Sequence, residues 1–381
     1  MKRAHRIEIF PRSFPARPIA AFLGALLVLA LVCGPHRARG ARGERVEDSH
    51  GLVPAFIHAA RSIRQHQHPA GYWETQVTPR PAFESVTPEV NTFTPALIVD
   101  LLEPVARETG LDEVLERARG YLRRQIEPTG LARYHGDPGS GNPSERGCEL
   151  PPDADDTALI WRIAPREDPE LLRAARRVME QYRTGGGLYL TWLGDQVTYR
   201  CFYRKFFPRD PNPPDVGIQM HVYLFLAKYD AAAAGRLCRA LRQRISADRI
   251  WVWYAVAPLL PLLREVDLAR AGCPVRVPDR QLQKAVSGQE AYMTEGRLLR
   301  DLVLSSDPHP FREPAIQTLR QLAAGGFETF SRTPPLLYHN ALLASPPHYH
   351  WSEDVGYALW LRLYVETARR SGGTLPLPYA G

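Results

Sequence analysis

The sequence has little cysteine and little lysine. Its five cysteines lie far apart and form no CxxC pair or other spacing typical of a metal site. Lysine occurs only at positions 2, 205, 228 and 284, so the net charge of +7 comes almost entirely from arginines scattered over amphipathic segments. This scatter, and the lack of any RNA- or DNA-binding motif, argue against nucleic acid as a partner.

The composition and the N-terminal segment predict a globular body on a hydrophobic leader. Of 381 residues, 44% are hydrophobic and 23% charged, which is typical of a folded domain. A basic region (residues 1–17) precedes an uncharged run (18–35) and an arginine-rich linker (36–49). The run is either a signal peptide or a short membrane anchor, and the lack of a small-x-small cleavage site favours the anchor. Basic residues flank both ends, and slightly more of them precede the run, which favours an exported body, residues 50–381.

An exported body would allow disulfides. The cysteines outside the hydrophobic run are Cys148, Cys201, Cys238 and Cys273, and the sequence does not indicate which of them pair.

Hydrophobic periodicity predicts that the body is an all-α domain of about six helical hairpins. Each hairpin would join an amphipathic outer helix to a more apolar inner helix. The predicted outer helices are residues 52–67, 111–126, 168–183, 231–245, 279–292 and 312–323. The predicted inner helices are residues 93–107, 153–164, 215–229, 251–266, 296–304 and 353–369. Residues 187–203 alternate with period two around Gly194 and Asp195, which predicts an inserted β-hairpin.

A short phrase recurs where outer helices end. Residues 67–73 fit Q-x-x-x-G-x-W, residues 321–327 fit it with Phe for Trp, and residues 125–130 and 181–185 are eroded copies. Glycine can end a helix in a left-handed turn, while the glutamine side chain bonds the freed backbone groups and the aromatic ring covers them. The phrase therefore predicts a repeated helical architecture.

The most informative stretch is residues 151–161, in which three acids precede an apolar run. Asp153 is a good helix N-cap, and Asp156, three residues on, makes a capping-box-like pair with it. The segments 213–221 and 353–360 begin similarly with a cap Asp, but Gly and an apolar residue replace the other two acids. Capping therefore leaves Asp155 unexplained.

Crowding changes the acidity of such carboxyls. A helix N-terminus lowers the pKa of a nearby acid, whereas like charges and burial raise it. In a water-poor cavity one carboxyl would stay protonated beside ionised neighbours, as a strong general acid requires. The alternative is a solvated helix start that carries one acid too many.

The segment from Asp153 to Ala158 resembles the DxDDTA motif of class II terpene cyclases, and the recurring phrase resembles the QW repeat of triterpene cyclases. The resemblance implies a single α/α toroid that acts on an isoprenoid or other lipid and needs no cofactor. It implies that Asp155 protonates an alkene or epoxide to start a cationic cyclisation, with Asp153 and Asp156 as flanking carboxylates. No DDxxD-type magnesium motif is present, so class I terpene chemistry is not expected.

The length of the chain raises a question about this reading. Class II cyclases usually react in a cavity between two helical domains, whereas residues 50–381 make only one toroid. The cavity would then be closed by a second copy of the chain in a homodimer, by the predicted hairpin or by the membrane; otherwise the chain has lost catalysis.

Other side chains could complete the site. His221 could hydrogen-bond to the acid, although a lone histidine on an apolar helix is more often a core residue. Several aromatic rings could line a cavity and stabilise carbocations: Trp192, Tyr223, Trp251, Trp351 and Tyr357. The simpler interpretation is that they are core residues. His348 and His350 suggest metal, but the Asp-x-Cys element of the zinc-binding toroidal prenyltransferases is missing, so no metal is expected.

Two other functions stay open. One is a non-catalytic, membrane-tethered toroid that binds a lipid or a protein. The other is a glycan-acting enzyme with paired carboxylates, because α/α barrels also host that chemistry.

Overall fold

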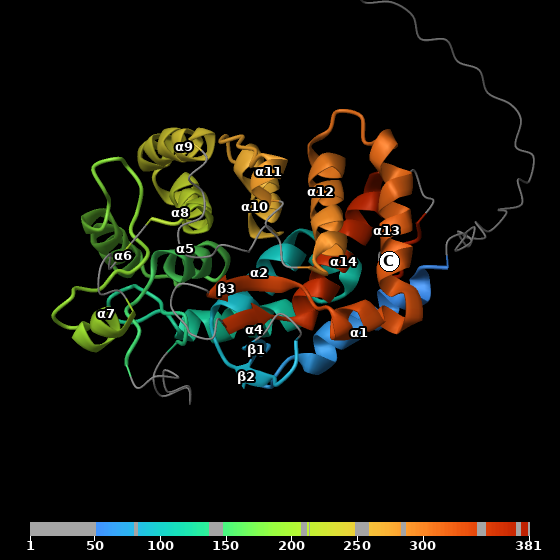
Figure 1. Ribbon diagram of the computed structural model, residues 1–381, viewed down its shortest axis with the longest axis horizontal. Helices are drawn as coiled ribbons and strands as arrows, with labels where there is room; N and C mark the ends of the chain where they lie inside the picture. Colours follow the sequence, from blue (N-terminus) through green and yellow to red (C-terminus); the bar gives the residue numbers. More distant parts are fainter. Residues whose placement is uncertain are drawn as a thin grey trace, which may run out of the picture. The chain divides into compact units, whose positions relative to one another are not determined.

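A closed ring of six apolar helices organises the described part of the chain (Figure 1). Each helix packs against the next, and the last packs against the first. In order, this inner ring consists of α2 (Phe93–Leu102), α5 (Ala154–Ile163), α8 (Val216–Tyr229), α10 (Leu259–Arg270), α12 (Glu290–Leu304) and α14 (Glu353–Arg370).

The structure is a computed structural model, and it describes residues 51–79, 83–136, 148–206, 212, 214–247, 259–282, 287–340, 348–370 and 375–379. The predicted basic region, hydrophobic run and linker lie outside these residues. Among the helices that are described, none combines the length and the apolar character needed to span a membrane.

The longer outer helices pack against the inner ring from outside. Helix α1 contacts α14, α4 contacts α2, α6 contacts α5, α9 contacts α8, and α13 contacts α12 and α14. These outer helices are α1 (Val53–His66), α4 (Asp112–Arg124), α6 (Pro169–Gln181), α9 (Ala231–Ser246) and α13 (His309–Arg332). Short helices complete the set: η1 (Glu103–Val105), α3 (Ala106–Thr109), α7 (Arg200–Phe206) and α11 (Asp279–Leu282). Every residue of α2 is buried, whereas α6 buries only two, which is the expected difference between an inner and an outer helix.

The predicted all-α toroid is thus confirmed, with one helix misplaced. The outer helix expected at residues 279–292 is wrong, because the described residues 287–289, between α11 and α12, are not helical. Gly288 adopts a φ of +90°, which interrupts the helical conformation just before α12 begins. Part of the inner helix expected at residues 251–266 lies outside the described residues, and α10 begins at Leu259.

The β-hairpin predicted at residues 187–203 is also wrong. Gly194 and Asp195 do form a turn, but the Asp195 carboxylate then accepts hydrogen bonds from the backbone N–H groups of Val197 (2.9 Å) and Thr198 (2.8 Å). This is the geometry of a helix cap, and the chain continues into α7 instead of returning as a strand.

A small antiparallel sheet was not predicted. Its strands are β1 (Thr75–Thr78), β2 (Thr87–Glu89), β3 (Leu336–Asn340) and β4 (His348–Trp351), in the order β2-β1-β4-β3. Strands this short carry little periodicity, and their partners lie far apart in sequence. Because β2 leads into α2 and β4 leads into α14, the sheet lies where these two inner helices begin.

The recurring phrase joins neighbouring hairpins. Gln67 Nε2 donates to the backbone oxygens of Val114 (2.8 Å) and Gly71 (3.3 Å), and the Trp73 indole donates to Ile63 O (2.9 Å). Gly71 has a φ of +104°. The glutamine thus bonds the next outer helix, α4, and the tryptophan covers the end of α1, as the phrase led us to expect.

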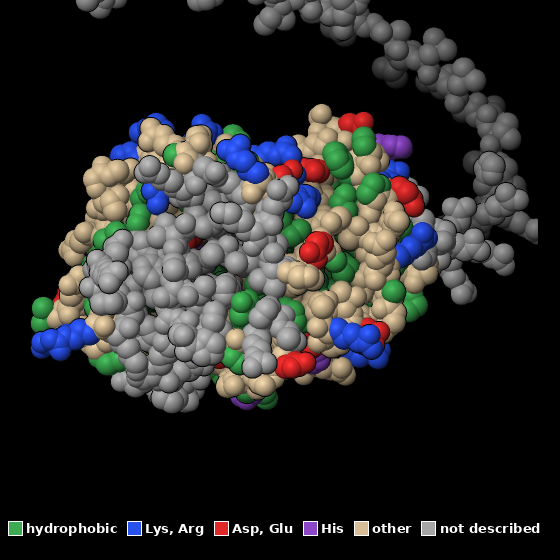
Figure 2. Space-filling model, in the orientation of Figure 1, with side chains coloured by type: hydrophobic (Ala, Val, Ile, Leu, Met, Phe, Trp, Pro, Cys, Tyr) green, Lys and Arg blue, Asp and Glu red, His purple; other side chains and the backbone are tan. Residues whose placement is uncertain are grey.

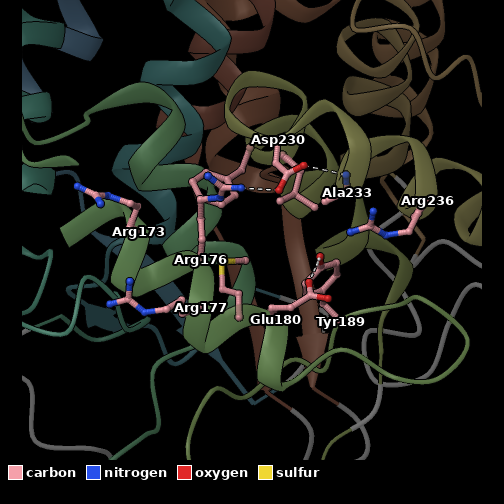
Figure 3. Close-up of a pocket in the computed structure, with 11 residues that line it drawn as sticks. Arg173, Arg176, Arg177, Glu180, Tyr189, Asp230, Ala233 and Arg236 are labelled. Carbon is pink, nitrogen blue, oxygen red and sulfur yellow. Dashed lines mark hydrogen bonds and ion pairs between the residues drawn. The ribbon is translucent and has the colours of Figure 1, made fainter. Parts of the chain in front are cut away.

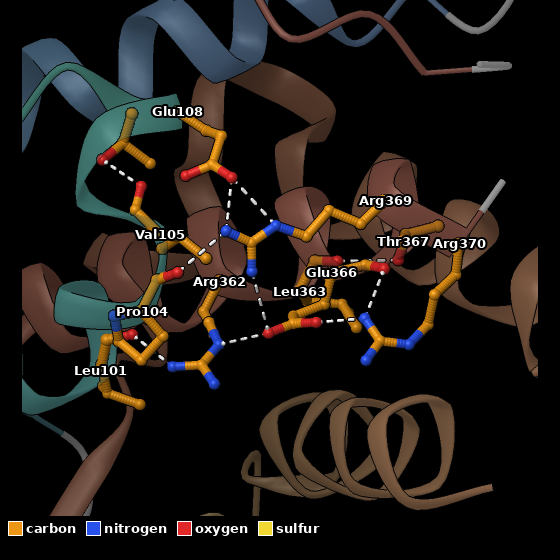
Figure 4. Close-up of polar contacts among 11 residues, drawn as sticks. Leu101, Pro104, Val105, Glu108, Arg362, Leu363, Glu366, Thr367, Arg369 and Arg370 are labelled. Carbon is orange, nitrogen blue, oxygen red and sulfur yellow. Dashed lines mark hydrogen bonds and ion pairs between the residues drawn. The ribbon is translucent and has the colours of Figure 1, made fainter. Parts of the chain in front are cut away.

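Arginines of α14 close the ring against α2 (Figure 4). Arg362 donates to Leu101 O (3.0 Å) at the end of α2, and Arg369 donates to Pro104 O (2.9 Å) in η1, which follows it directly. The buried carboxylate of Glu366 holds Arg362 at 3.2 Å and also pairs with Arg370. These contacts fix the first and last inner helices side by side.

Replacing Gly130 by alanine should destabilise the protein by more than about 1 kcal/mol. Gly130 has a φ of +82°, and a Cβ there would lie 2.4 Å from the backbone oxygen of Leu171 on α6. Urea unfolding measures the effect, with Gly185→Ala as the control because a Cβ at Gly185 meets nothing within 4 Å. Equal stability of the two variants would contradict the close approach of Gly130 to α6.

Candidate active site

The three acids lie at the start of α5, with Asp153 as the N-cap. Its carboxylate accepts a hydrogen bond from the Asp156 backbone N–H at 2.8 Å, so the predicted cap is confirmed. Asp156 does not return the bond, because Asp153 N donates to Ala132 O (3.1 Å) and Asp156 Oδ1 accepts from Thr92 Oγ1 (2.9 Å). The capping-box half of the prediction is therefore wrong. The hydroxyl of Thr92 instead ties the start of α2 to the start of α5.

All three carboxyls hold their protons more tightly than usual. Burial raises the pKa of Asp155, and burial together with the other two carboxyls raises the pKa of Asp153 well above its ordinary range. Burial and the Asp155 charge raise the pKa of Asp156 to about 7. Asp153 and Asp156 are buried, whereas 20% of the Asp155 side chain remains exposed. Asp155 is therefore the member of the cluster that a ligand could reach.

His221 on α8 faces Asp155. Its Nε2 accepts a hydrogen bond from Arg264 Nε at 3.0 Å, and because arginine only donates, the ring hydrogen must be on Nδ1. Nδ1 lies 3.9 Å from Asp155 Oδ2, and no described residue hydrogen-bonds to it. Burial and the neighbouring Arg264 and Arg162 hold the pKa of His221 well below its usual value. The ring is thus neutral and presents an N–H to the acid.

A buried ionic network fixes this histidine from behind. Arg264 on α10 and Arg162 on α5 both pair with Asp100 on α2. Although burial opposes ionisation, the two guanidinium groups hold the pKa of Asp100 below its usual range. Four inner helices thereby form one chain of contacts, from Asp100 through Arg264 and His221 to Asp155. Charged residues on apolar helices were the only sign of this network in the sequence.

The predicted aromatic residues are divided between several places. Trp192 pairs its backbone with Asp153 in an isolated β-bridge and packs edge-on against Phe202 (4.8 Å). The Tyr223 hydroxyl donates to Ala271 O (2.6 Å) at the end of α10. Trp351 lies in a small apolar cluster with Leu336 and Tyr349, and Tyr357 packs against Phe327 and Phe330. Trp251 lies outside the described residues. Only Trp192 is thereby placed at the acid cluster, through its backbone.

The rings that do lie near His221 were not predicted. The Phe93 ring is 6.0 Å from that of His221 and 6.2 Å from that of Tyr338. Tyr338 stacks on His350 at 4.2 Å. These residues lie on or beside the unpredicted sheet, which is why periodicity within single helices did not reveal them.

A cation could in principle be held by the acids. Carboxylate oxygens of Asp153, Asp155 and Asp156 lie within 4.8 Å of one another. However, Asp153 and Asp156 are already engaged by a backbone N–H and the Thr92 hydroxyl, and the raised pKa values favour protons over a metal at this cluster. The arrangement fits a proton donor better than a metal centre.

A separate pocket of about 460 Å³ lies between the outer helices α6 and α9 (Figure 3). Arg176 pairs with Asp230 at its wall, and the Tyr189 hydroxyl donates to Glu180 (3.1 Å). Basic side chains also gather along the edge that α9 occupies (Figure 2), where the helix carries four arginines and no acid. The pocket contains none of the predicted site residues.

Comparison with known proteins shows the fold. No protein-family model matches the chain, and no curated sequence is detectably similar to it. The described unit has the helical fold of type II terpene cyclases. A product complex of type II terpene cyclase MstE from Scytonema, with merosterolic acid A, is 15% identical with a TM-score of 0.52 and covers 84% of this chain and 98% of its own. A substrate complex of the same cyclase, with geranylgeranyl dihydroxybenzoate, is 14% identical with a TM-score of 0.53, covering 84% and 99%.

Proposed function

We propose that this protein is a terpene cyclase of the class II type, in which Asp155 protonates an isoprenoid alkene or epoxide. The observation that carries the proposal is the position of Asp155, which is partly exposed and whose pKa burial raises, opposite the His221 N–H at the start of an inner helix. The fold, and the presence of isoprenoid-like ligands in the two cyclase structures, support it.

The two oxygens of the Asp155 carboxyl would have different roles. Oδ2 faces the His221 N–H, which can only donate to it. The acid proton therefore resides on the other oxygen, where it can be given to substrate. The π electrons of the alkene form the new C–H bond and leave a cation on the neighbouring carbon; with an epoxide, the oxygen takes the proton and a C–O bond breaks.

The size of the chain is compatible with this reaction. The alignment covers 98% of a structure that holds a cyclisation product, so one unit of this extent is enough to bind it in that protein. Closure of the cavity by a second copy of this chain stays a prediction, which mass photometry would check.

The test is incubation of the full chain in D2O with squalene, oxidosqualene, linear prenyl diphosphates, geranylgeranyl dihydroxybenzoate and, separately, a set of glycosides, followed by mass spectrometry. The expected result is a cyclic product that forms equally well with EDTA. From an alkene it carries one non-exchangeable deuterium on carbon, whereas from an epoxide the deuterium lies on oxygen and exchanges. If EDTA abolishes turnover, the acid cluster works as a metal site instead. Turnover of glycosides alone supports the glycan-acting alternative, and no turnover of any probe supports the binding module.

We further propose that the body is exported and works at a membrane surface. Two disulfides, Cys148–Cys201 and Cys238–Cys273, form in the described residues, and such bonds persist in oxidising compartments. The acid-free basic face of α9 suits anionic lipid, from which an isoprenoid substrate would be taken.

Reduction of these disulfides should lower the melting temperature of the full chain, because each bond contributes about 2–4 kcal/mol. The measurement is thermal unfolding with and without dithiothreitol, alongside thiol labelling of protein taken directly from cells. Fully labelled cysteines in the native protein would contradict an exported body.

A further inference from the structure

A second polar cluster surrounds Glu89, which lies at the end of β2 and is 5% exposed. Its Oε1 accepts hydrogen bonds from the Tyr134 hydroxyl and from Asn91 Nδ2 (3.1 Å). His135 Nε2 lies 3.4 Å from Oε2, and His350 Nδ1 lies 3.7 Å from Oε1. Side chains from three separate segments of the chain thus converge on one buried carboxylate.

This cluster adjoins the acid cluster. Thr92, three residues after Glu89, donates to Asp156. Phe93 is near the His221 ring on one side and the Tyr338 ring on the other, and Tyr338 stacks on His350. One wall of aromatic rings therefore connects the histidine beside the acid to the histidine beside Glu89.

The two clusters have opposite electrostatics. Burial and crowding raise the pKa values of the three aspartates. Although burial opposes ionisation, hydrogen bonds from His135 and His350 hold the pKa of Glu89 below its usual range. Titratable groups whose environments drive their pKa values apart mark the acid and the base of a reaction.

His350 has the geometry of an oriented base. It lies on β4, is 6% exposed, and is clamped flat against Tyr338 with a ring separation of 4.2 Å. Its Nδ1 faces the Glu89 carboxylate and is 3.5 Å from the Tyr134 hydroxyl. Among the described residues, the hydrogen-bond contacts of this ring are made through Nδ1, which leaves the Nε2 lone pair for another partner. A carboxylate that holds one nitrogen of a histidine fixes its tautomer and the direction of the other nitrogen.

We propose that His350 is the base that ends the cyclisation, with Glu89 as the residue that positions its ring. The proposal rests on the cyclase function. In this step the C–H bond beside the cationic carbon breaks, its electron pair forms the C=C bond, and the proton passes to His350 Nε2. The resulting imidazolium is stabilised by the Glu89 carboxylate. Each turnover thus takes one proton from Asp155 and leaves one on His350, and exchange with solvent restores both groups.

The experiment compares the full chain with its His350→Asn and Glu89→Gln variants in D2O, using whichever probe of the panel the unaltered chain converts. We expect His350→Asn to consume substrate and, if the probe is an alkene, still to add one deuterium at the first carbon. The yield of the alkene that the unaltered chain forms should fall at least tenfold relative to the yields of isomeric alkenes and of alcohols formed by capture of water. Glu89→Gln should change this product ratio in the same direction. The control is His309→Asn, an exposed histidine at the start of α13.

These measurements distinguish the role of His350 from the cyclase function. An unchanged product ratio in His350→Asn overturns the role of His350 and leaves the cyclase function standing. The lack of any product from the unaltered chain overturns the cyclase function, and the role of His350 with it.

A second measurement needs no substrate. In protein labelled with 15N-histidine, the signal that disappears in His350→Asn should show hydrogen on Nδ1 and a bare Nε2 at neutral pH. A ring with hydrogen on Nε2, or one carrying both protons, would overturn the proposal.

Discussion

Replacing Asp155 by asparagine is expected to lower the rate of cyclisation at least about a thousandfold, because the amide cannot supply the proton that starts the reaction. Asparagine keeps the size and the hydrogen-bonding shape of the side chain, so substrate binding should change little. The measurement is single-turnover product formation followed by mass spectrometry. The control is Asp168→Asn, the same change at the N-cap of the outer helix α6, where the carboxylate accepts from Leu171 N (3.0 Å) and asparagine also caps well.

The same variant should be as stable as the original chain or more stable. The folded-state pKa of Asp156 is raised from 3.8 to about 7, so its contribution to stability is complete below pH 4 and is lost as the pH rises through 7. Burial raises the pKa of Asp155 as well, so a neutral amide in its place avoids the cost of ionising a buried carboxyl. Lost activity with an unchanged or higher melting temperature therefore identifies a functional acid. Retained turnover in Asp155→Asn would rule Asp155 out as the donor.

The Asp100→Asn variant should lose about 3–5 kcal/mol of stability, which is the usual cost of removing one partner from a buried ionic network. Asp100 is 4% exposed at its side chain and pairs with both Arg162 and Arg264, so the change leaves two guanidinium groups without their common counter-charge. Urea unfolding at neutral pH measures the loss. Glu116→Gln is the control: its carboxylate is 57% exposed and pairs with Arg119 at 3.5 Å, a kind of contact worth less than about 1 kcal/mol.

Asp100→Asn should also reduce activity in the fraction that remains folded. Arg264 fixes the tautomer of His221 through the bond from its Nε, and it is itself held by Asp100. Loss of that hold lets the His221 ring rotate away from Asp155. A destabilisation of less than about 1 kcal/mol, with full activity, would contradict a role for the network in supporting the site.

Three inner helices, α5, α8 and α14, were predictable because each buries most of its residues. Helices α5, α8 and α14 occupy their predicted ranges to within one residue at each end. The outer helix expected at residues 279–292 failed where Gly288 breaks the chain, and the hairpin failed because the Asp195 carboxylate captured two backbone N–H groups. Both errors come from the effect of a single residue, which hydrophobic periodicity averaged over a segment cannot detect.

The sequence by itself determined the repeated helical plan and the identity of Asp155 as an acid that capping does not need. These are local properties, because helix periodicity and the capping role of Asp153 depend on neighbours within one turn. Only the tertiary structure decided which nitrogen of His221 carries hydrogen, since Arg264 lies 43 residues away. It alone also brought Glu89 to His350, through a sheet whose outer strands come from opposite ends of the described chain. Proton chemistry depends on such distances and on burial, and neither exists until the ring of helices has closed.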